Sequence, residues 1–190
     1  MGDGNVGKTS IKRSFIGLGF ESTYLATLGA DFSIKEHIFQ PKDKKEKVLV
    51  KFMIWDLAGQ FRFGSVRPHY YLGSHAGLII YDVTNRNSLE NVMRWAEEFK
   101  KTINNPVPIA LIGNKIDLRD EQKVLGITTE EGQNICKILK EFVHKVDSKS
   151  GAHQYDINFL ETSAKTGENI NKAFDSIAEE LYKRYLSDNY

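Results

Sequence analysis

The sequence predicts an α/β domain with a mainly parallel sheet, because short buried strands alternate along it with amphipathic helices. Two continuous apolar runs, 78–81 and 109–112, are typical of strands covered on both faces. Elsewhere apolar residues recur at helical spacing, as in helices that bury one face. At 190 residues, with 41% apolar and 27% charged residues, the chain is expected to form one globular domain, 1–190.

The individual elements follow from local patterns. Gly17 and Gly19 end a first helix, Ser88 is expected to cap a later one, and Thr128 and Glu131 have the spacing of a capping box. In chain order we expect a helix at 8–16, strands at 31–39, 48–55 and 78–81, a helix over 89–103, a strand at 109–112, a helix from the capping box through 143, a strand at 159–162 and a helix over 170–181. Loops are expected at 20–30 and 56–68. Ligands of such sheets bind beyond the carboxyl ends of the strands, so the loops there should carry the chemistry.

Composition limits the function classes. A net charge of +1 gives no electrostatic argument for binding nucleic acid. The single cysteine, Cys136, rules out an internal disulfide framework and is interpreted as a buried apolar residue. No segment approaches the roughly 18 apolar residues of a membrane span, and no secretory signal is recognisable. We therefore expect a cytoplasmic protein whose contacts with membranes are made through partners.

The first motif is GxxxxGK[ST], formed by Gly2, Gly7, Lys8 and Thr9. Glycines allow such a loop to curl so that its backbone N–H groups point at phosphate oxygens, and the helix that follows favours an anion at its N-terminus. Lys8 supplies a positive charge for the β- and γ-phosphates, and the Thr9 hydroxyl is a hard oxygen ligand for Mg²⁺.

A second motif, Asp56-Leu57-Ala58-Gly59-Gln60, follows the strand at 48–55. A carboxylate at a strand end can hold Mg²⁺ directly or through water, Gly59 lets a backbone N–H approach a γ-phosphate, and Gln60 could orient an attacking water. An ordinary turn after a strand explains the same residues equally well.

The third motif, Asn114-Lys115-Ile116-Asp117, is more specific. Guanine presents two adjacent N–H donors that the Asp117 carboxylate can accept together, whereas adenine would leave that carboxylate unpaired, at a cost of about 1–3 kcal/mol or more. Asn114 can contact the other edge of the base and brace the loop.

Three further residue groups depend on these motifs for their interpretation. In Thr162-Ser163-Ala164-Lys165, a backbone N–H can reach the base oxygen while Lys165 lies against the ring. Thr27 could contact both Mg²⁺ and the γ-phosphate, which would make its loop sensitive to the nucleotide state. Phe20 could pack on the edge of the purine.

Together these motifs resemble the Ras superfamily of small GTPases over essentially the whole chain. The finer resemblance is to the Rab branch, through 27–32, 54–56, 62–63, 70–73 and 80–84. It implies a P-loop NTPase fold with helices on both faces of the central sheet, guanine nucleotide with Mg²⁺ as ligands, and a switch in vesicle trafficking. It also implies effector, exchange-factor and GTPase-activating partners at two switches, about 19–30 and 59–71.

The resemblance assigns a role to each matching residue. Catalysis would fall to Gln60 and Lys8, and Mg²⁺ to Thr9, Thr27 and Asp56. The nucleotide contacts would be Asp3, Gly4, Asn5, Val6, Gly7, Lys8, Thr9, Ser10, Phe20, Thr27, Gly59, Asn114, Lys115, Asp117, Ser163, Ala164 and Lys165.

The chain also departs from the family pattern. Phe61 stands where Glu is usual, the hairpin around Lys44 is long, and 144–157 resembles an insertion. Only Met1 precedes the phosphate loop, although this fold places a central strand there. We expect that a start codon chosen too far downstream accounts for the missing strand. No C-terminal cysteine is present, so we expect no lipid anchor at that end.

The predicted reaction is hydrolysis of GTP to GDP and phosphate by a water that Gln60 orients. No arginine is an evident built-in finger, so a slow intrinsic rate and a partner that supplies one are expected. A P-loop kinase or ATPase would share the first motif but has no use for Asn114 and Asp117. A non-catalytic interaction module with impaired nucleotide binding is the other alternative, because the strand before the loop is missing.

Overall fold

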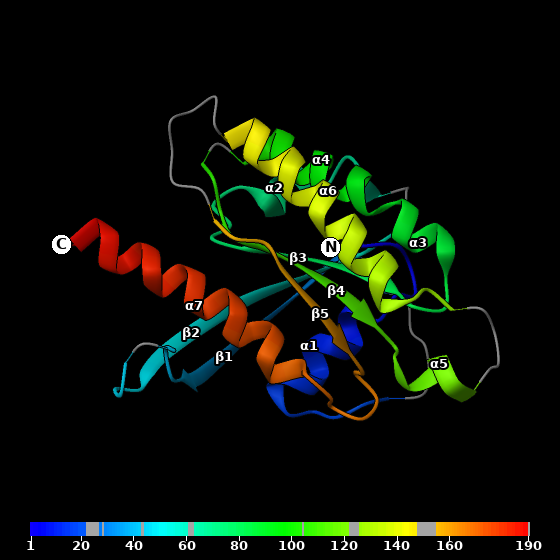
Figure 1. Ribbon diagram of the computed structural model, residues 1–190, viewed down its shortest axis with the longest axis horizontal. Helices are drawn as coiled ribbons and strands as arrows, with labels where there is room; N and C mark the ends of the chain where they lie inside the picture. The colour runs from blue at the N-terminus through cyan, green and yellow to red at the C-terminus, as the bar shows by residue number, and fades with distance from the viewer. Residues whose placement is uncertain are drawn as a thin grey trace.

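The computed structural model describes residues 1–21, 27, 29–42, 44–60, 63–103, 105–121, 126–147 and 155–189. Three parallel strands form one sheet in the order β3 (Gly77–Asp82), β4 (Ile109–Asn114) and β5 (Asn158–Thr162). An antiparallel hairpin consists of β1 (Ala30–Phe39) and β2 (Val48–Leu57). Helices lie on both sides of the parallel sheet (Figure 1), so the predicted α/β architecture is confirmed.

Each face of the parallel sheet is covered by a pair of helices. Figure 1 shows α4 (Val92–Thr102) and α6 (Thr129–Asp147) on one face, and α1 (Lys8–Ile16) and α7 (Ile170–Asn189) on the other. Shorter helices are α2 (Arg67–Tyr71), α3 (Arg86–Glu90) and α5 (Asp117–Glu121).

The side chains of the central strands explain this two-sided burial. Ile79 and Leu111 belong to the core under α4 and α6, whereas Ile80 and Ile112 belong to the core under α1 and α7. All four are 4% exposed or less. Successive strand residues point to opposite faces, so a continuous apolar run satisfies both cores at once.

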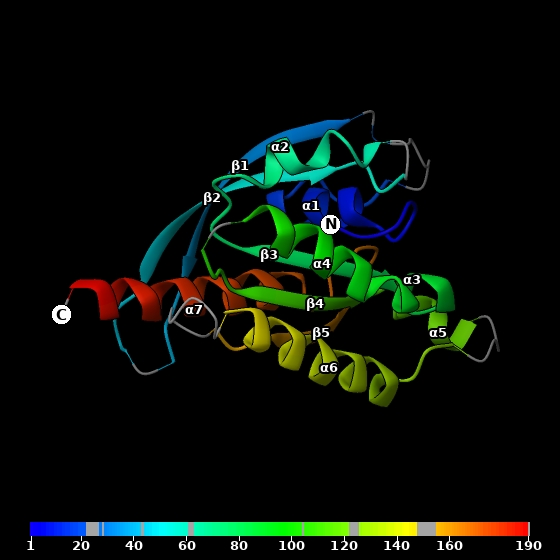
Figure 2. The same ribbon diagram turned by 90° about the horizontal axis from the view of Figure 1, so that it is seen from above.

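Aromatic packing attaches the hairpin to the helices. Phe15 of α1 stacks on Phe174 of α7, with ring centroids 3.6 Å apart and planes 6° from parallel. Phe52 of β2 meets Phe174 edge-on at 5.5 Å. In Figure 2 the hairpin lies on the β3 side of the parallel sheet, with β5 at the far side.

Met1 lies beside β3. Its nitrogen donates to the carbonyl of Leu78 (2.7 Å), and its carbonyl accepts from the N–H of Ile80 (2.9 Å), as in a neighbouring parallel strand. Within the described residues no strand joins β2 to β3. These two bonds fix Met1 beside the middle of β3, so the phosphate loop starts there and runs on toward the carboxyl end of that strand.

The structure corrects two predicted boundaries. Strand β2 continues to Leu57, so Asp56 lies in a strand and not in the expected loop 56–68. The extension follows from its pairing with β1, in which Asp31 faces Asp56. The helix expected over 89–103 is two helices, α3 and α4, that meet at Asn91.

The two capping predictions have different outcomes. Ser88 lies inside α3, where its Oγ accepts from the N–H of Asp82 (3.0 Å), so its predicted role as a helix cap is wrong. The capping box is confirmed: the N–H of Glu131 donates to Thr128 Oγ1 (3.2 Å), and the N–H of Thr128 donates to Glu131 Oε2 (2.8 Å). Helix α6 begins at Thr129, the residue after Thr128.

Several predictions fall outside the described residues. These are the substitution at Phe61, residues 22–26 and 28 of the first expected switch, and residues 148–154 of the expected insertion. The beginning of that insertion is helical, because α6 continues to Asp147. In the part of the chain that the structure describes, no helix is both long and apolar enough to cross a bilayer.

Two buried tyrosines give opposite predictions for stability. Tyr81 Oη is buried and has no hydrogen-bond partner among the described residues, whereas Tyr71 Oη donates to Glu98 Oε1 at 2.8 Å. We expect Tyr81→Phe to raise the free energy of unfolding by about 1–3 kcal/mol, since it removes an unsatisfied buried hydroxyl. The matched variant Tyr71→Phe should lower it. Urea denaturation measures both, and equal destabilisation by the two variants would contradict this assignment.

Candidate functional site

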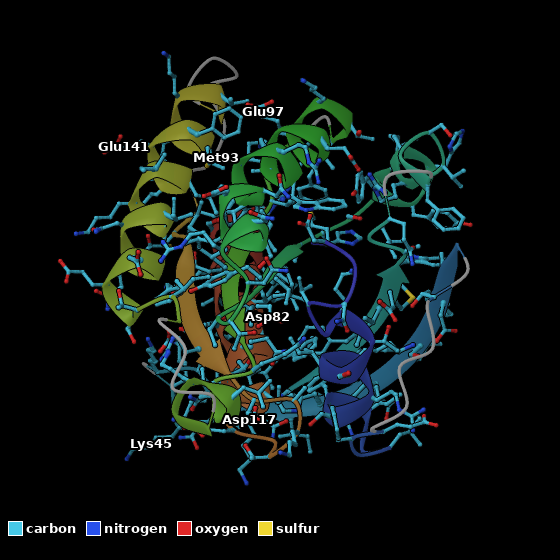
Figure 3. The ribbon with its side chains drawn as sticks, turned by 90° about the vertical axis from the view of Figure 1, so that its right-hand side faces the viewer. Lys45, Asp82, Met93, Glu97, Asp117 and Glu141 are labelled. Carbon is cyan, nitrogen blue, oxygen red and sulfur yellow. The ribbon has the colours of Figure 1, made fainter. Side chains whose placement is uncertain are left out.

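A cavity of about 550 Å³ opens at the carboxyl ends of the parallel strands. Figure 3 views the molecule from this end and labels Asp82, which ends β3, and Asp117. The cavity brings together most residues that the motifs predicted, from segments far apart in the sequence. Its lining is Gly4, Asn5, Gly7, Lys8, Thr9, Ser10, Arg13, Phe20, Glu21, Thr27, Ala58, Gly59, Gln60, Asn114, Lys115, Asp117, Leu118, Ala164 and Lys165.

The phosphate loop gives one end of the cavity a positive character. Gly7 has a φ of +95° and directly precedes α1, and no side chain caps the amide groups of the first turn. The Lys8 ammonium group donates to the carbonyls of Gly2 (2.9 Å) and Asp3 (2.6 Å). Burial lowers the pKa of Lys8 to about 8, although the carboxylates of Asp56 and Asp3 act in the opposite direction. An exposed helix N-terminus beside a desolvated ammonium group suits an anionic ligand.

Asn114 joins three segments at the centre of the site. Its Nδ2 donates to the Val6 carbonyl (2.9 Å), and its Oδ1 accepts from Thr162 Oγ1 (3.1 Å) and from the N–H of Ala164 (3.1 Å). The side chain is buried at 1% exposure. A Cβ on Gly7 would lie 2.3 Å from Asn114 Nδ2, so the motif's second glycine is required by this contact. The phosphate loop and the loop after β5 are therefore held together by one amide.

Asp117 and its neighbours form the other end of the cavity. Ser163 Oγ donates to Asp117 Oδ1 (2.5 Å), and Lys165 Nζ lies 3.8 Å from Asp117 Oδ2. Lys115 adopts a φ of +71°, and its Nζ lies 2.7 Å from Asp82 Oδ2. These contacts orient a carboxylate and two ammonium groups around the place where the motif predicts a base.

Three oxygen-bearing side chains suit a magnesium ion. The hydroxyls of Thr9 and Thr27 lie 3.0 Å apart. Both carboxylate oxygens of Asp56 are buried and have no hydrogen-bond partner among the described residues. Hard oxygen donors of this kind, completed by water and phosphate, are the ligands that Mg²⁺ prefers. Among the described residues there is no cluster of three or more acidic, His or Cys side chains able to hold a metal.

Gln60 faces the cavity with an available acceptor. Its Oε1 is buried and has no hydrogen-bond partner in the part of the chain that the structure describes. Its neighbour Gly59 packs on the phosphate loop so closely that a Cβ there would lie 2.5 Å from the Asp3 backbone. The turn is thus placed directly against the loop predicted to bind phosphate.

Comparison with known proteins identifies the family. The family model described as the Ras family matches residues 1–183. The chain belongs to the Ras family of small GTPases. Ras-related protein Rab-26 of Homo sapiens is 37% identical over 187 residues, which cover 98% of this chain and 63% of that protein. GTP-binding protein YPT52 of Saccharomyces cerevisiae is 35% identical over 202 residues, covering 96% of this chain and 80% of its own length.

A third relative supports the same branch of the family. Ras-related protein Rab-10 of Diplobatis ommata is 34% identical over 184 residues, covering 97% of this chain and 80% of that protein. The prediction of a Rab-like small GTPase with a P-loop NTPase fold is therefore confirmed.

Four predicted site residues lie outside the cavity lining: the nucleotide contacts Asp3, Val6 and Ser163, and the magnesium ligand Asp56. The Asp3 carboxylate points to α4, where it accepts from Asn91 Nδ2 and Trp95 Nε1, each at 2.7 Å. Val6 is fully buried in the core below the loop, and Ser163 is fully buried while it holds Asp117. Their side chains support the lining residues, and only the backbone of Asp3 faces Lys8.

Sequence reasoning missed the residues that hold the Gln60 turn. Arg67 forms a bidentate ion pair with Glu98 of α4 (2.7 and 2.8 Å), and its Nη1 donates to the Gln60 carbonyl (3.0 Å). Its guanidinium carbon lies 4.6 Å from the centre of the Trp95 ring. No local pattern marks Arg67, because its partners lie on a distant helix. The contact of Asp82 with Lys115 was also missed, although Asp82 lies at the end of a buried strand, the same position that drew attention to Asn114.

Removal of the Glu98 charge should loosen this turn. In Glu98→Gln the bidentate pair with Arg67 is lost, so the contact that holds the Gln60 carbonyl weakens. We expect hydrogen exchange in a peptide covering 57–66 to accelerate about tenfold or more, from a loss of about 1–3 kcal/mol. Glu97→Gln is the matched control, because Glu97 is half exposed and its ion pair with Lys101 is a loose surface contact, at 3.9 Å. Equal exchange in the two variants would show that the pair does not hold the turn.

Proposed function

We propose that the chain binds guanine nucleotide with Mg²⁺ and hydrolyses GTP to GDP and phosphate, as a switch between two nucleotide states. The observation that carries the proposal is the Asn114 side chain, which joins the phosphate loop to the loop after β5. One cavity is thereby lined by groups suited to phosphate, to a metal ion and to a base. The Rab and Ypt names of the relatives support a role in vesicle trafficking.

Guanine selectivity would depend on Asp117. Its carboxylate is kept in place by Ser163 and faces the cavity beside Lys165. The two N–H donors on the Watson–Crick edge of guanine satisfy both oxygens of a carboxylate. Adenine offers no such pair, and a carboxylate left unpaired in a closed site is costly.

Hydrolysis would proceed by attack of water on the γ-phosphorus, with cleavage of its bond to the β–γ bridging oxygen. Gln60 Oε1 has the burial and the open acceptor needed to orient that water. Lys8 would neutralise charge that develops on the bridging oxygen. Mg²⁺, held by Thr9 and Thr27 and by Asp56 through water, supplies further charge neutralisation when bound.

A slow intrinsic rate is part of the proposal. Arg13 lines the cavity, but its guanidinium group lies 3.2 Å from Glu21 and is already paired. A partner that supplies an arginine at the γ-phosphate would then accelerate the reaction, by a factor that reaches about 10⁵ for Ras and its activating protein.

The switching element would be the pair of loops that meet over the γ-phosphate. The N–H of Ala58 donates to the Gly29 carbonyl (2.8 Å), which links the first predicted switch to the residue just before the second. Loss of the γ-phosphate would remove the ligand shared by Thr27 and Gly59 and release both loops. Effectors, exchange factors and activating proteins would read these segments, about 19–30 and 59–71.

The alternative is an interaction module that keeps the fold but binds nucleotide poorly. It is favoured by the separation of the hairpin from the parallel sheet among the described residues. Nucleotide binding by the purified chain decides between the two, because only the switch requires it.

Asp117→Asn tests the base site. The amide cannot accept both N–H groups of guanine, so we expect affinity for GDP to fall about 5- to 150-fold, while the weak affinity for ADP changes little. Competition against fluorescent GDP measures both constants. The control Glu168→Gln alters an exposed carboxyl in a neighbouring loop. Unchanged GDP affinity in Asp117→Asn would refute the base assignment.

Gln60→Leu tests the catalytic assignment. Leucine fills similar space but cannot accept a hydrogen bond from water, so single-turnover GTP hydrolysis should slow by about tenfold or more, because positioning of the attacking water is lost. GTP binding should persist. A hydrolysis rate equal to that of the wild-type chain would remove Gln60 from the mechanism.

A further inference from the structure

Lys12 lies in an unusual place for a charged side chain. It follows Thr9 by three residues in α1, so the two side chains share a face of the helix one turn apart. Its side chain is only 5% exposed. Lysine is rarely buried to this extent unless carboxylates pair with its ammonium group.

Two carboxylates from the hairpin surround this ammonium group. Lys12 Nζ forms an ion pair with Asp31 Oδ2 and lies 3.8 Å from Asp56 Oδ2. Asp31 and Asp56 face each other directly in the antiparallel register of β1 and β2. Like charges directly opposite one another destabilise a sheet, so Lys12 compensates a repulsion that the pairing imposes.

The two carboxylates differ in their access to water. The side chain of Asp31 is 61% exposed, whereas that of Asp56 is 1% exposed. Neither oxygen of Asp56 has a hydrogen-bond partner among the described residues. A buried carboxylate of this kind depends on nearby positive charge, and Lys12 supplies it from the side of the helix.

Asp56 also interacts with the N-terminal ammonium group of Met1, which donates to the Leu78 carbonyl, and with the ammonium group of Lys8. Lys8 Nζ, however, donates to the carbonyls of Gly2 and Asp3 in the phosphate loop. In the proposed function Lys8 also serves the phosphates. Lys12 is not among the residues that line the cavity, so its contact with Asp56 does not compete with a contact to the nucleotide.

We propose that Lys12 is a resident counter-ion of Asp56 that weakens the coupling between Mg²⁺ and nucleotide binding. The inference rests on the proposed function, in which Asp56 holds Mg²⁺ through water. A fixed positive charge beside Asp56 repels a divalent cation, and it remains in place when that cation leaves. Compared with the same chain without a counter-ion for Asp56, this chain therefore binds Mg²⁺ more weakly. It also releases nucleotide more slowly when Mg²⁺ is absent.

Lys12→Met tests this directly, because methionine preserves much of the apolar stem and removes the charge. The measurement is the release rate of fluorescent GDP from the full chain over a series of buffered free Mg²⁺ concentrations. The midpoint is the Mg²⁺ concentration at which the release rate lies halfway between its values in EDTA and in saturating Mg²⁺. We expect this midpoint to fall about tenfold in Lys12→Met, which corresponds to about 1.4 kcal/mol. The ratio of the release rate in EDTA to that in saturating Mg²⁺ should rise by a similar factor.

A second variant gives the opposite sign. Asp31→Asn changes an exposed side chain, so the fold should persist. The substitution removes one of the two carboxylates near Lys12, so that Asp56 becomes the remaining carboxylate partner of its ammonium group. The midpoint Mg²⁺ concentration should then rise. Lys172→Met, on the exposed surface of α7, is the control and should leave the midpoint unchanged.

The outcomes separate this inference from the proposed function. A wild-type chain that binds no GDP, or releases it independently of Mg²⁺, overturns both. The role of Lys12 alone is overturned if release from the wild-type chain depends on Mg²⁺ but the variants behave differently from expectation. Those outcomes are an unchanged or raised midpoint Mg²⁺ concentration in Lys12→Met, or an unchanged or lowered one in Asp31→Asn.

Discussion

The site depends on the hydrogen bonds of one buried amide. Asn114 uses Nδ2 toward Val6 and Oδ1 toward Thr162 and Ala164, so both ends of its side chain are satisfied by other segments. A buried donor or acceptor left unpaired costs about 1–3 kcal/mol, which makes any displacement of these segments unfavourable. These hydrogen bonds consequently hold the phosphate loop and the segment after β5 against the end of β4.

Helix α4 connects this arrangement to the Gln60 turn. Trp95 donates to the Asp3 carboxylate on one side and lies beneath the Arg67 guanidinium group on the other. Arg67 in turn contacts the Gln60 carbonyl and Glu98. The phosphate loop and the turn that carries Gln60 are therefore both held by side chains of the same helix, α4. A change at either one can alter the other through side chains that have fixed partners.

The sequence was most informative at the strand ends. Parallel strands present their carboxyl ends at a single edge, so the motifs containing Lys8, Asn114 and Ala164 could be placed together without coordinates, and the cavity contains all three. The capping box at Thr128 was equally predictable, because it depends on residues three positions apart. Local spacing and the rule for ligand position in parallel sheets were sufficient for these features.

Contacts that depend on tertiary register were not predictable. The extension of β2 through Asp56 follows from its pairing with β1, and the role of Ser88 follows from the position of Asp82. Arg67 meets Glu98 only because α2 packs on α4, an arrangement that neither helix encodes by itself. The burial of Lys12 between Asp31 and Asp56 likewise arises where α1 crosses the hairpin.

The nucleotide content of the purified chain tests the central claim most directly. The protein would be denatured after extensive washing, and the released nucleotides would be identified and quantified by chromatography. A nucleotide site held together by Asn114 predicts about one guanine nucleotide per chain, without adenine nucleotides, and the loss of that nucleotide when Mg²⁺ is chelated. A chain that carries no nucleotide and takes up no GDP on incubation with Mg²⁺ would contradict the account.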